Sequence, residues 1–131
     1  MNKKKISVMV CEDNNLMLHG LKFLLNEFGD LELVAFAKTG NEAISKAREM
    51  QPDVILMDIG LPELDGISAS RIIKAERPYV RIIVVSAAQD EKTRSDAKAA
   101  GADEIFPKPV MNAEELYLTI KKVFESAHSK F

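Results

Sequence analysis

Short apolar runs alternate with amphipathic segments along the whole chain. Residues 6–11, 31–37, 54–57, 81–86 and 104–106 are rich in β-branched and other apolar side chains, and we expect each run to form a strand. The run at residues 54–57 is unbroken, which is typical of a central strand covered on both faces. The pattern therefore predicts a sheet whose middle lies in the core.

The segments that follow these strands carry apolar residues at helical spacing, so we expect five helices. Asp13 or Asn14 can cap the first helix, and Gly29 is predicted to end it. Residues 90–100 are strongly charged and have only alanine as an apolar side chain, so the fourth helix should pack weakly. The inward faces of the other four are predicted to be Met17, Leu21, Leu24, Leu25 and Phe28; Ala43, Ile44, Ala47 and Met50; Ile67, Ala69, Ile72 and Ile73; and Ala113, Leu116, Tyr117, Ile120, Phe124 and Ala127.

A strand followed by a helix, repeated five times, predicts an α/β fold with a parallel sheet and helices on both faces. The chain has 131 residues and shows no internal linker, low-complexity segment or repeat. We therefore expect residues 1–131 to form a single domain, with residues 128–131 as a candidate start of a linker to an output domain outside this chain.

Composition narrows the class of protein further. Formal net charge is -2 and hydrophobic residues make up 47% of the chain, which argues against a general nucleic-acid or membrane-surface binder. The single cysteine, Cys11, excludes an intrachain disulfide and fits a reducing cytoplasm. No apolar run approaches the length of a membrane span, and the N-terminal run becomes acidic too soon for a signal peptide. We expect a cytoplasmic domain.

Polar residues follow four of the predicted strands: Glu12 and Asp13, Asp58, Ser86, and Lys108. The carboxyl ends of parallel strands share one edge of the sheet, where ligands bind in open α/β folds, so these side chains should converge. Three carboxylates in one pocket need a cation unless they are protonated, and an all-oxygen set suits Mg²⁺, with Mn²⁺ as an alternative. Such an ion beside a lysine and a hydroxyl also suits a phosphoryl group, with Asp58 as the nucleophile.

These residues, with the segments "MDIGLPELDG", "VVSAA" and "GADEIFPKP", resemble the receiver domain of two-component response regulators. The resemblance covers nearly the whole chain and implies the flavodoxin-like fold with sheet order 2-1-3-4-5. It implies that Asp58 accepts a phosphoryl group from a histidine kinase, a phosphotransfer protein or a small phosphodonor. It also implies that Asp13, Asp58 and the Gly60 carbonyl bind Mg²⁺, that Glu12 acts through a bound water, and that Lys108 and, after phosphorylation, Ser86 contact the phosphoryl oxygens.

The same resemblance directs the output to the face formed by the fourth helix, the fifth strand and the fifth helix. The partner is an output domain, a separate protein or a second copy of the chain, and the domain itself is expected to bind neither nucleic acid nor membrane. Candidate partner-facing residues are Lys92, Arg94, Lys98 and Tyr117. The family usually has an aromatic switch residue three positions before the lysine; this chain has Ile105 there and Phe106 next to it. Segments such as "DIGLPELDG" are similar to receivers attached to DNA-binding domains, so a transcriptional regulator is one expected context.

Three other functions compete with this hypothesis. An aspartyl phosphatase of the haloacid-dehalogenase type usually has a second Asp where this chain has Gly60, and it needs room for a cap. A flavodoxin-like FMN carrier needs a phosphate-binding loop where this chain has Glu12, Asp13, Asn14 and Asn15. A pseudo-receiver without phosphorylation is disfavoured by the complete set of acidic residues and lysine. The interpretation is therefore a non-enzymatic switch with self-catalysed phosphorylation and dephosphorylation only.

Overall fold

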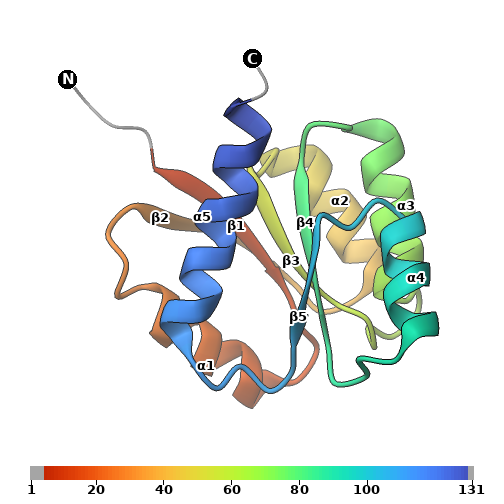
Figure 1. The fold of residues 1–131 in the computed structure, drawn as a ribbon, viewed down its shortest axis with the longest axis horizontal. Helices are drawn as coiled ribbons and strands as arrows, with labels where there is room; N and C mark the ends of the chain where they lie inside the picture. The colour runs from red at the N-terminus through yellow and green to blue at the C-terminus, as the bar shows by residue number, and fades with distance from the viewer. Residues whose placement is uncertain (1–4, 130–131) are drawn as a thin grey trace.

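The computed structural model describes residues 5–129, with side chains described as far as residue 126. Strands and helices alternate in the predicted order (Figure 1). The strands are β1 (Ile6–Cys11), β2 (Leu31–Ala37), β3 (Val54–Asp58), β4 (Arg81–Ser86) and β5 (Glu104–Pro107). The helices are α1 (Asn15–Leu25), α2 (Gly40–Met50), α3 (Gly66–Glu76), α4 (Glu91–Ala99) and α5 (Ala113–Ser129).

The strands form one parallel sheet with the order β2-β1-β3-β4-β5, so the topology implied by the family resemblance is confirmed. The central strand β3 is buried along its whole length, as its unbroken apolar run predicted. The chain crosses from one face of the sheet to the other between α1 and α2, and back again between α4 and α5. All strands end at the same edge of the sheet, the lower one in Figure 1. That edge is where the predicted site residues follow their strands.

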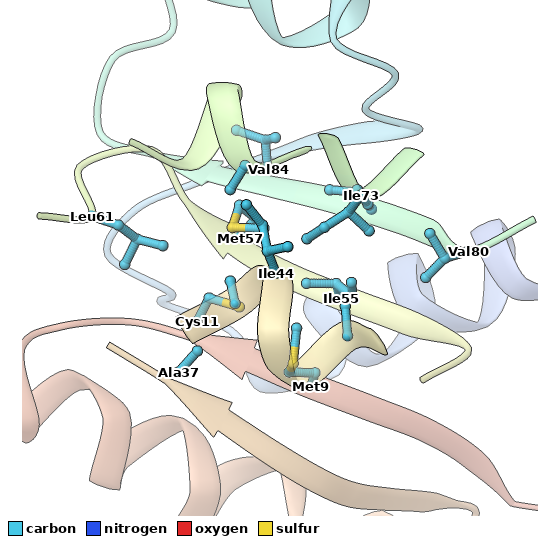
Figure 2. Close-up of a cluster of buried hydrophobic side chains, with 14 of the residues drawn as sticks. Met9, Cys11, Ala37, Ile44, Ile55, Met57, Leu61, Ile73, Val80 and Val84 are labelled. Carbon is cyan, nitrogen blue, oxygen red and sulfur yellow. The ribbon is translucent and has the colours of Figure 1, made fainter. Parts of the chain in front are cut away.

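Two separate hydrophobic clusters cover the two faces of the sheet. Along β3, Ile55 and Met57 point to the face covered by α2, α3 and α4, whereas Val54 and Leu56 point to the face covered by α1 and α5. Figure 2 shows the first cluster, in which Met57 and its neighbours in adjacent strands meet Ile44 of α2. Alternation along a strand thus places apolar residues in two cores at once.

The first helix differs from its prediction in face and in length. Its buried residues are Leu18, Leu21 and Leu25, whereas Met17 is only partly buried. The helix ends at Leu25 rather than at Gly29, because the N–H of Phe28 bonds to the Leu25 carbonyl at 3.1 Å in a tighter turn. The prediction of Met17 as a core residue and of Gly29 as the end of the helix was therefore wrong.

Other helix faces follow the expectation in part. Met50 at the end of α2 is 43% exposed and Ile72 of α3 is 38% exposed. Both were predicted to face the core, and that prediction was wrong. Met50 follows the last buried residue of α2, Ala47, whereas Ile72 lies beside the buried stripe of α3, which includes the next residue, Ile73. The buried residue of α4 is Ala97, which confirms that this helix buries little apolar surface. The α5 residues buried in the described part are Leu116, Ile120 and Val123, and the Ala127 side chain lies outside the described part.

The loop that follows β3 is held in place by two close backbone approaches. A Cβ on Gly66 would collide with the carbonyl oxygen of Asp58, and a Cβ on Gly40 would collide with that of Leu64. The Gly66 N–H also donates to the Ile59 carbonyl at 2.9 Å. Because only glycine allows backbone to pack this closely, the two glycines fix the loop beside Asp58.

At the C-terminal end, residues 128 and 129 belong to α5, and residues 130 and 131 of the expected linker lie outside the described residues. Among the described residues, no helix combines the length and apolar character needed to span a membrane.

Candidate functional site

The register of β1 and β3 brings Glu12 beside Asp58. Cys11 pairs with Met57, so the next residue on each strand lies at the same level of the sheet edge. Glu12 is 2% exposed and Asp58 is 6% exposed, although both carry carboxylates. Burying two neighbouring carboxylates is unfavourable unless cations or hydrogen-bond donors compensate them. This edge is therefore built for a cation.

The register of the next two strands adds a hydroxyl and an amine. Asp58 pairs with Val85, and Ser86 pairs with Pro107, so Ser86 and Lys108 both lie just beyond Asp58 along the strand direction. The Lys108 N–H donates to the Ser86 carbonyl at 3.0 Å, which continues the β4–β5 ladder to the lysine. Residues that are far apart in sequence thus converge, as predicted from the parallel topology.

Lys108 lies between the two buried carboxylates. Its Nζ is 3.1 Å from Oε1 of Glu12 and 3.1 Å from Oδ2 of Asp58, and its side chain is 21% exposed. Burial by itself lowers the pKa of Lys108, but the hydrogen bonds and charges of Glu12 and Asp58 outweigh burial and raise the pKa above its usual value. The lysine is therefore held as a cation in the pocket.

Asp13 completes an acidic cluster with Glu12 and Asp58. One carboxylate oxygen from each residue lies within 4.8 Å of the others. With Lys108, the formal charge is three negative plus one positive, or −2, which matches one divalent cation. Oxygen ligands with this charge fit Mg²⁺, so Glu12, Asp13 and Asp58 are the residues that could hold it.

Asn14, rather than Asp13, caps α1. Its side-chain oxygen accepts from the N–H of Met17 at 2.9 Å, and its own N–H donates to Oε2 of Glu12 at 3.1 Å. Asp13 remains exposed and is free of the capping role that was predicted as an alternative for it. The contact of Asn14 with Glu12 was missed by sequence reasoning, although its position directly after the acidic pair is a usable signal.

The acidic cluster opens into a depression of about 580 Å³ that is also lined by Gly60 and Ser86. The Gly60 N–H donates to Oδ1 of Asp58 at 3.4 Å. The Ser86 hydroxyl accepts from the N–H of Ala88 at 3.0 Å, so its own proton is not used in that bond. All five predicted pocket side chains, and the Gly60 backbone, therefore border one accessible space next to Asp58.

The two candidate switch residues lie on opposite faces of the sheet. Phe106 is buried in the cluster under α1 and α5. Ile105 is half-buried and lines a second depression of about 610 Å³, which we call the α4–β5 groove; its lining is Gln89, Glu91, Arg94, Ser95, Lys98, Ala102, Asp103, Glu104 and Ile105. Ile105 thus occupies the position between the groove and the core.

Tyr117, a candidate partner-facing residue, is half-buried and makes contacts within the molecule. Its ring stacks on Phe28, with ring centroids 4.1 Å apart, and its hydroxyl donates to Asp30 at 2.7 Å. These contacts turn Tyr117 to the α1 side of α5 and leave Arg94 and Lys98 as the predicted residues that line the groove. Lys92 is exposed on α4 and pairs with Asp96. Tyr117 thus packs against the α1–β2 connection, and its partner-facing role stays a prediction.

Fold and site together define an α/β protein of flavodoxin-like topology, with an acidic, lysine-containing pocket at the carboxyl edge of its sheet. The family model described as "Response regulator receiver domain" matches residues 8–121, and the chain belongs to this family. The receiver-domain assignment made from the sequence is thereby confirmed.

Individual relatives agree with the family. The chain is 37% identical to protein-glutamate methylesterase/protein-glutamine glutaminase 2 of Carboxydothermus hydrogenoformans, over 96% of this chain and 35% of that protein. It is 31% identical to the transcriptional regulatory protein LnrK of Bacillus subtilis, over 95% of this chain and 54% of that protein. The response regulator domain of Thermotoga maritima CheB superimposes with a TM-score of 0.86 at 35% identity, covering 93% of this chain and 98% of that chain. The chain thus spans from about a third to about half the length of these two full-length relatives.

Proposed function

We propose that this receiver domain is a phosphorylation-dependent switch in which Asp58 accepts a phosphoryl group from a histidine kinase, a phosphotransfer protein or a small phosphodonor. The observation that carries the proposal is the position of Lys108, 3.1 Å from both Glu12 and Asp58, next to the carboxylate of Asp13. A buried carboxylate with an adjacent cation and an acidic metal cluster is the arrangement that phosphoryl transfer to aspartate requires.

In the proposed reaction, a carboxylate oxygen of Asp58 attacks phosphorus and forms the new P–O bond. The bond from phosphorus to the donor breaks, and its electron pair leaves with the donor, an imidazole nitrogen of a phosphohistidine or a carboxylate oxygen of an acyl phosphate. Lys108 offsets charge on the phosphoryl oxygens, and Ser86 donates its hydroxyl proton to one of them. Mg²⁺, held by Asp13, Asp58 and the Gly60 carbonyl and through a water by Glu12, would supply the remaining positive charge.

The phosphorylated Asp58 side chain carries about −1.5 to −2 charge, where the free carboxylate carried −1, so the charge balance of the pocket changes. Ser86 and Lys108 are the groups positioned to respond. Ser86 is the last residue of β4, and Lys108 directly follows β5 and donates its N–H to the Ser86 carbonyl. The α4–β5 groove and the adjoining face of α5 are the proposed output surface for an attached domain, a separate protein or a second copy. The weak packing of α4, which buries Ala97, supports this assignment because a loosely packed helix shifts at low free-energy cost.

The test is incubation with acetyl phosphate and Mg²⁺ followed by intact-mass measurement. We expect the wild-type chain to gain one phosphoryl group, and the Asp58→Asn variant to gain none. Removing Mg²⁺ with a chelator should abolish the gain. An unmodified wild type, or equal labelling of Asp58→Asn, would contradict the proposal.

The whole protein's role is a further part of the proposal. Relatives named as a methylesterase/glutaminase and as a transcriptional regulator both contain a segment similar to this chain. We propose that this domain likewise controls a separate output activity and works in the cytoplasm, where histidine kinases present their phosphoryl groups. The receiver itself needs no enzymatic activity beyond its own phosphorylation and dephosphorylation.

A further inference from the structure

We infer that Gln89 is a latch that couples Ser86 to helix α4, in place of the aromatic switch residue that this chain lacks. The inference rests on the proposed phosphorylation of Asp58 and goes beyond it by naming the contact through which the signal reaches the output groove. Gln89 lies in the connection between β4 and α4, and it also lines the α4–β5 groove.

The side chain of Gln89 bonds in two directions. Its Nε2 donates to the backbone carbonyl of Ser86 at 2.8 Å. Its Oε1 accepts from Nη1 of Arg94, a residue of α4, at 3.1 Å. Both ends of the amide are therefore used, and a single side chain joins the edge of the phosphorylation pocket to the helix that borders the groove.

The hydroxyl of Ser86 sits at the start of this connection. In the structure it accepts from the N–H of Ala88 at 3.0 Å, so the backbone just before Gln89 is held close to Ser86. If Ser86 rotates about χ1 so that its hydroxyl reaches a phosphoryl oxygen, Oγ moves away from the N–H of Ala88, the bond between them is lost and the connection is freed. The Ser86 carbonyl cannot follow, because it also accepts from the N–H of Lys108 at 3.0 Å in the β4–β5 ladder.

Movement of the connection would therefore break the hydrogen bond from Gln89 to the Ser86 carbonyl. The bond in which Arg94 donates to Gln89 would be lost with it. Helix α4 is the element that this loss can displace, since its one buried residue is Ala97 and its other side chains are exposed or half-buried. Ile105 lines the same groove and is free to fill space that α4 vacates. The latch thus stabilises the unphosphorylated arrangement and is released by phosphorylation.

Reciprocity gives the latch a measurable signature. A contact made only in the unphosphorylated state opposes every ligand that favours the phosphorylated one, so removing the contact must tighten that ligand. Beryllofluoride with Mg²⁺ is a phosphoryl analogue suited to the test. A residue with a merely structural role would leave the affinity for this analogue unchanged or weaken it.

The experiment compares wild type, Gln89→Ala and a matched control, Lys92→Ala, which removes an exposed ion pair from the same helix. Beryllofluoride affinity is measured by 19F NMR, and amide exchange of residues 91–99 by mass spectrometry. For Gln89→Ala we expect roughly two- to fivefold tighter beryllofluoride binding and roughly two- to fivefold faster exchange in the free protein, a factor set mainly by the part-buried bond to Ser86 because the exposed bond to Arg94 contributes little in water. Lys92→Ala should change neither.

Equal affinity and equal exchange in Gln89→Ala and wild type would overturn the latch, as would weaker beryllofluoride binding. A wild type that binds no beryllofluoride and is not labelled by acetyl phosphate would instead overturn the proposed function. In that case the latch is still decided by the exchange of residues 91–99 in the free proteins, where unchanged exchange in Gln89→Ala rejects it.

Discussion

Lys108 is ion-paired with Asp58, with 3.1 Å between Nζ and Oδ2. The residue proposed to receive the phosphoryl group is therefore already in contact with the residue proposed to neutralise it. Glu12 shares the same ammonium group at 3.1 Å, so one cation compensates two buried carboxylates. This relationship makes the lysine a structural element of the pocket before it has any role in signalling.

Replacing Lys108 with methionine should destabilise the metal-free protein. The substitution keeps a long apolar side chain but leaves the buried carboxylates of Glu12 and Asp58 without their cation. Because the lysine side chain is partly exposed, the expected loss in the free energy of unfolding is about 1–2 kcal/mol at neutral pH, below the value for a fully buried pair. Chemical denaturation with and without Mg²⁺ measures it, and Mg²⁺ should recover part of the loss.

The pH dependence of that loss has a definite sign. The folded state raises the pKa of Lys108 above its ordinary value of 10.5, so its stabilisation is present below that pH and is lost as the pH rises through the raised pKa. The difference between wild type and Lys108→Met should therefore shrink at alkaline pH. Lys92→Met, which removes an exposed lysine, is the control and should show little difference at either pH. A difference that stays constant across this range would contradict the ion-pair explanation.

Asp13 and its neighbour Asn14 should separate metal binding from helix stability. Asp13→Asn removes one charged oxygen ligand from the acidic cluster, so Mg²⁺ affinity measured by calorimetry should fall at least about tenfold with little change in stability. Asn14→Ala removes the cap of α1 and should lower the free energy of unfolding by about 1 kcal/mol while Mg²⁺ affinity is kept. The opposite pattern, with Asn14 controlling the metal, would show that the cluster is assigned wrongly.

The sheet and its pocket could be predicted from the sequence because both depend on local patterns, namely short apolar runs and the polar residues that end them. Unbroken apolar runs identify buried strands, and each run ends at a polar residue whose position follows directly from the run. Once the strands are parallel, their carboxyl ends must share an edge, and Glu12, Asp58 and Ser86 converge without further information. The family resemblance then supplied the strand order, which alternation alone does not determine.

The faces of the helices could be predicted less well, since they depend on how each helix is rotated against the sheet. A shift of one position moves Leu18 into the core and Met17 towards the surface. The bond between Tyr117 and Asp30 could not be predicted, because Asp30 lies in a turn distant in sequence. The two bonds of Gln89 could not be foreseen either, because an exposed amide has no periodic pattern.

Gly66 and Gly20 form a matched pair for testing the support of Asp58. An alanine at Gly66 would place its Cβ against the Asp58 carbonyl, so Gly66→Ala should lower the free energy of unfolding by about 1–3 kcal/mol and reduce labelling by acetyl phosphate. Gly20 lies within α1 with nothing near the position of a Cβ, so Gly20→Ala should raise stability by about 0.5–1 kcal/mol and leave labelling intact. Normal labelling of Gly66→Ala would refute the role of this close approach.

Tyr117 should control the titration of Asp30 across the α1–α5 side of the molecule. The hydrogen bond from Tyr117, followed by that from Lys121, holds the pKa of Asp30 below its ordinary value of 3.8. A lowered carboxylate pKa contributes stability that is present above the ordinary pKa and lost as the pH falls through the folded one. Tyr117→Phe keeps the stacked ring but removes the strongest donor, so the pKa of Asp30, followed by NMR, should rise towards its ordinary value, and stability should fall less steeply with acid. Lys121→Met should also raise the pKa of Asp30, because it removes a second hydrogen bond and a neighbouring positive charge. An Asp30 titration that is unchanged in Tyr117→Phe would mean that the hydroxyl does not bond this carboxylate in solution.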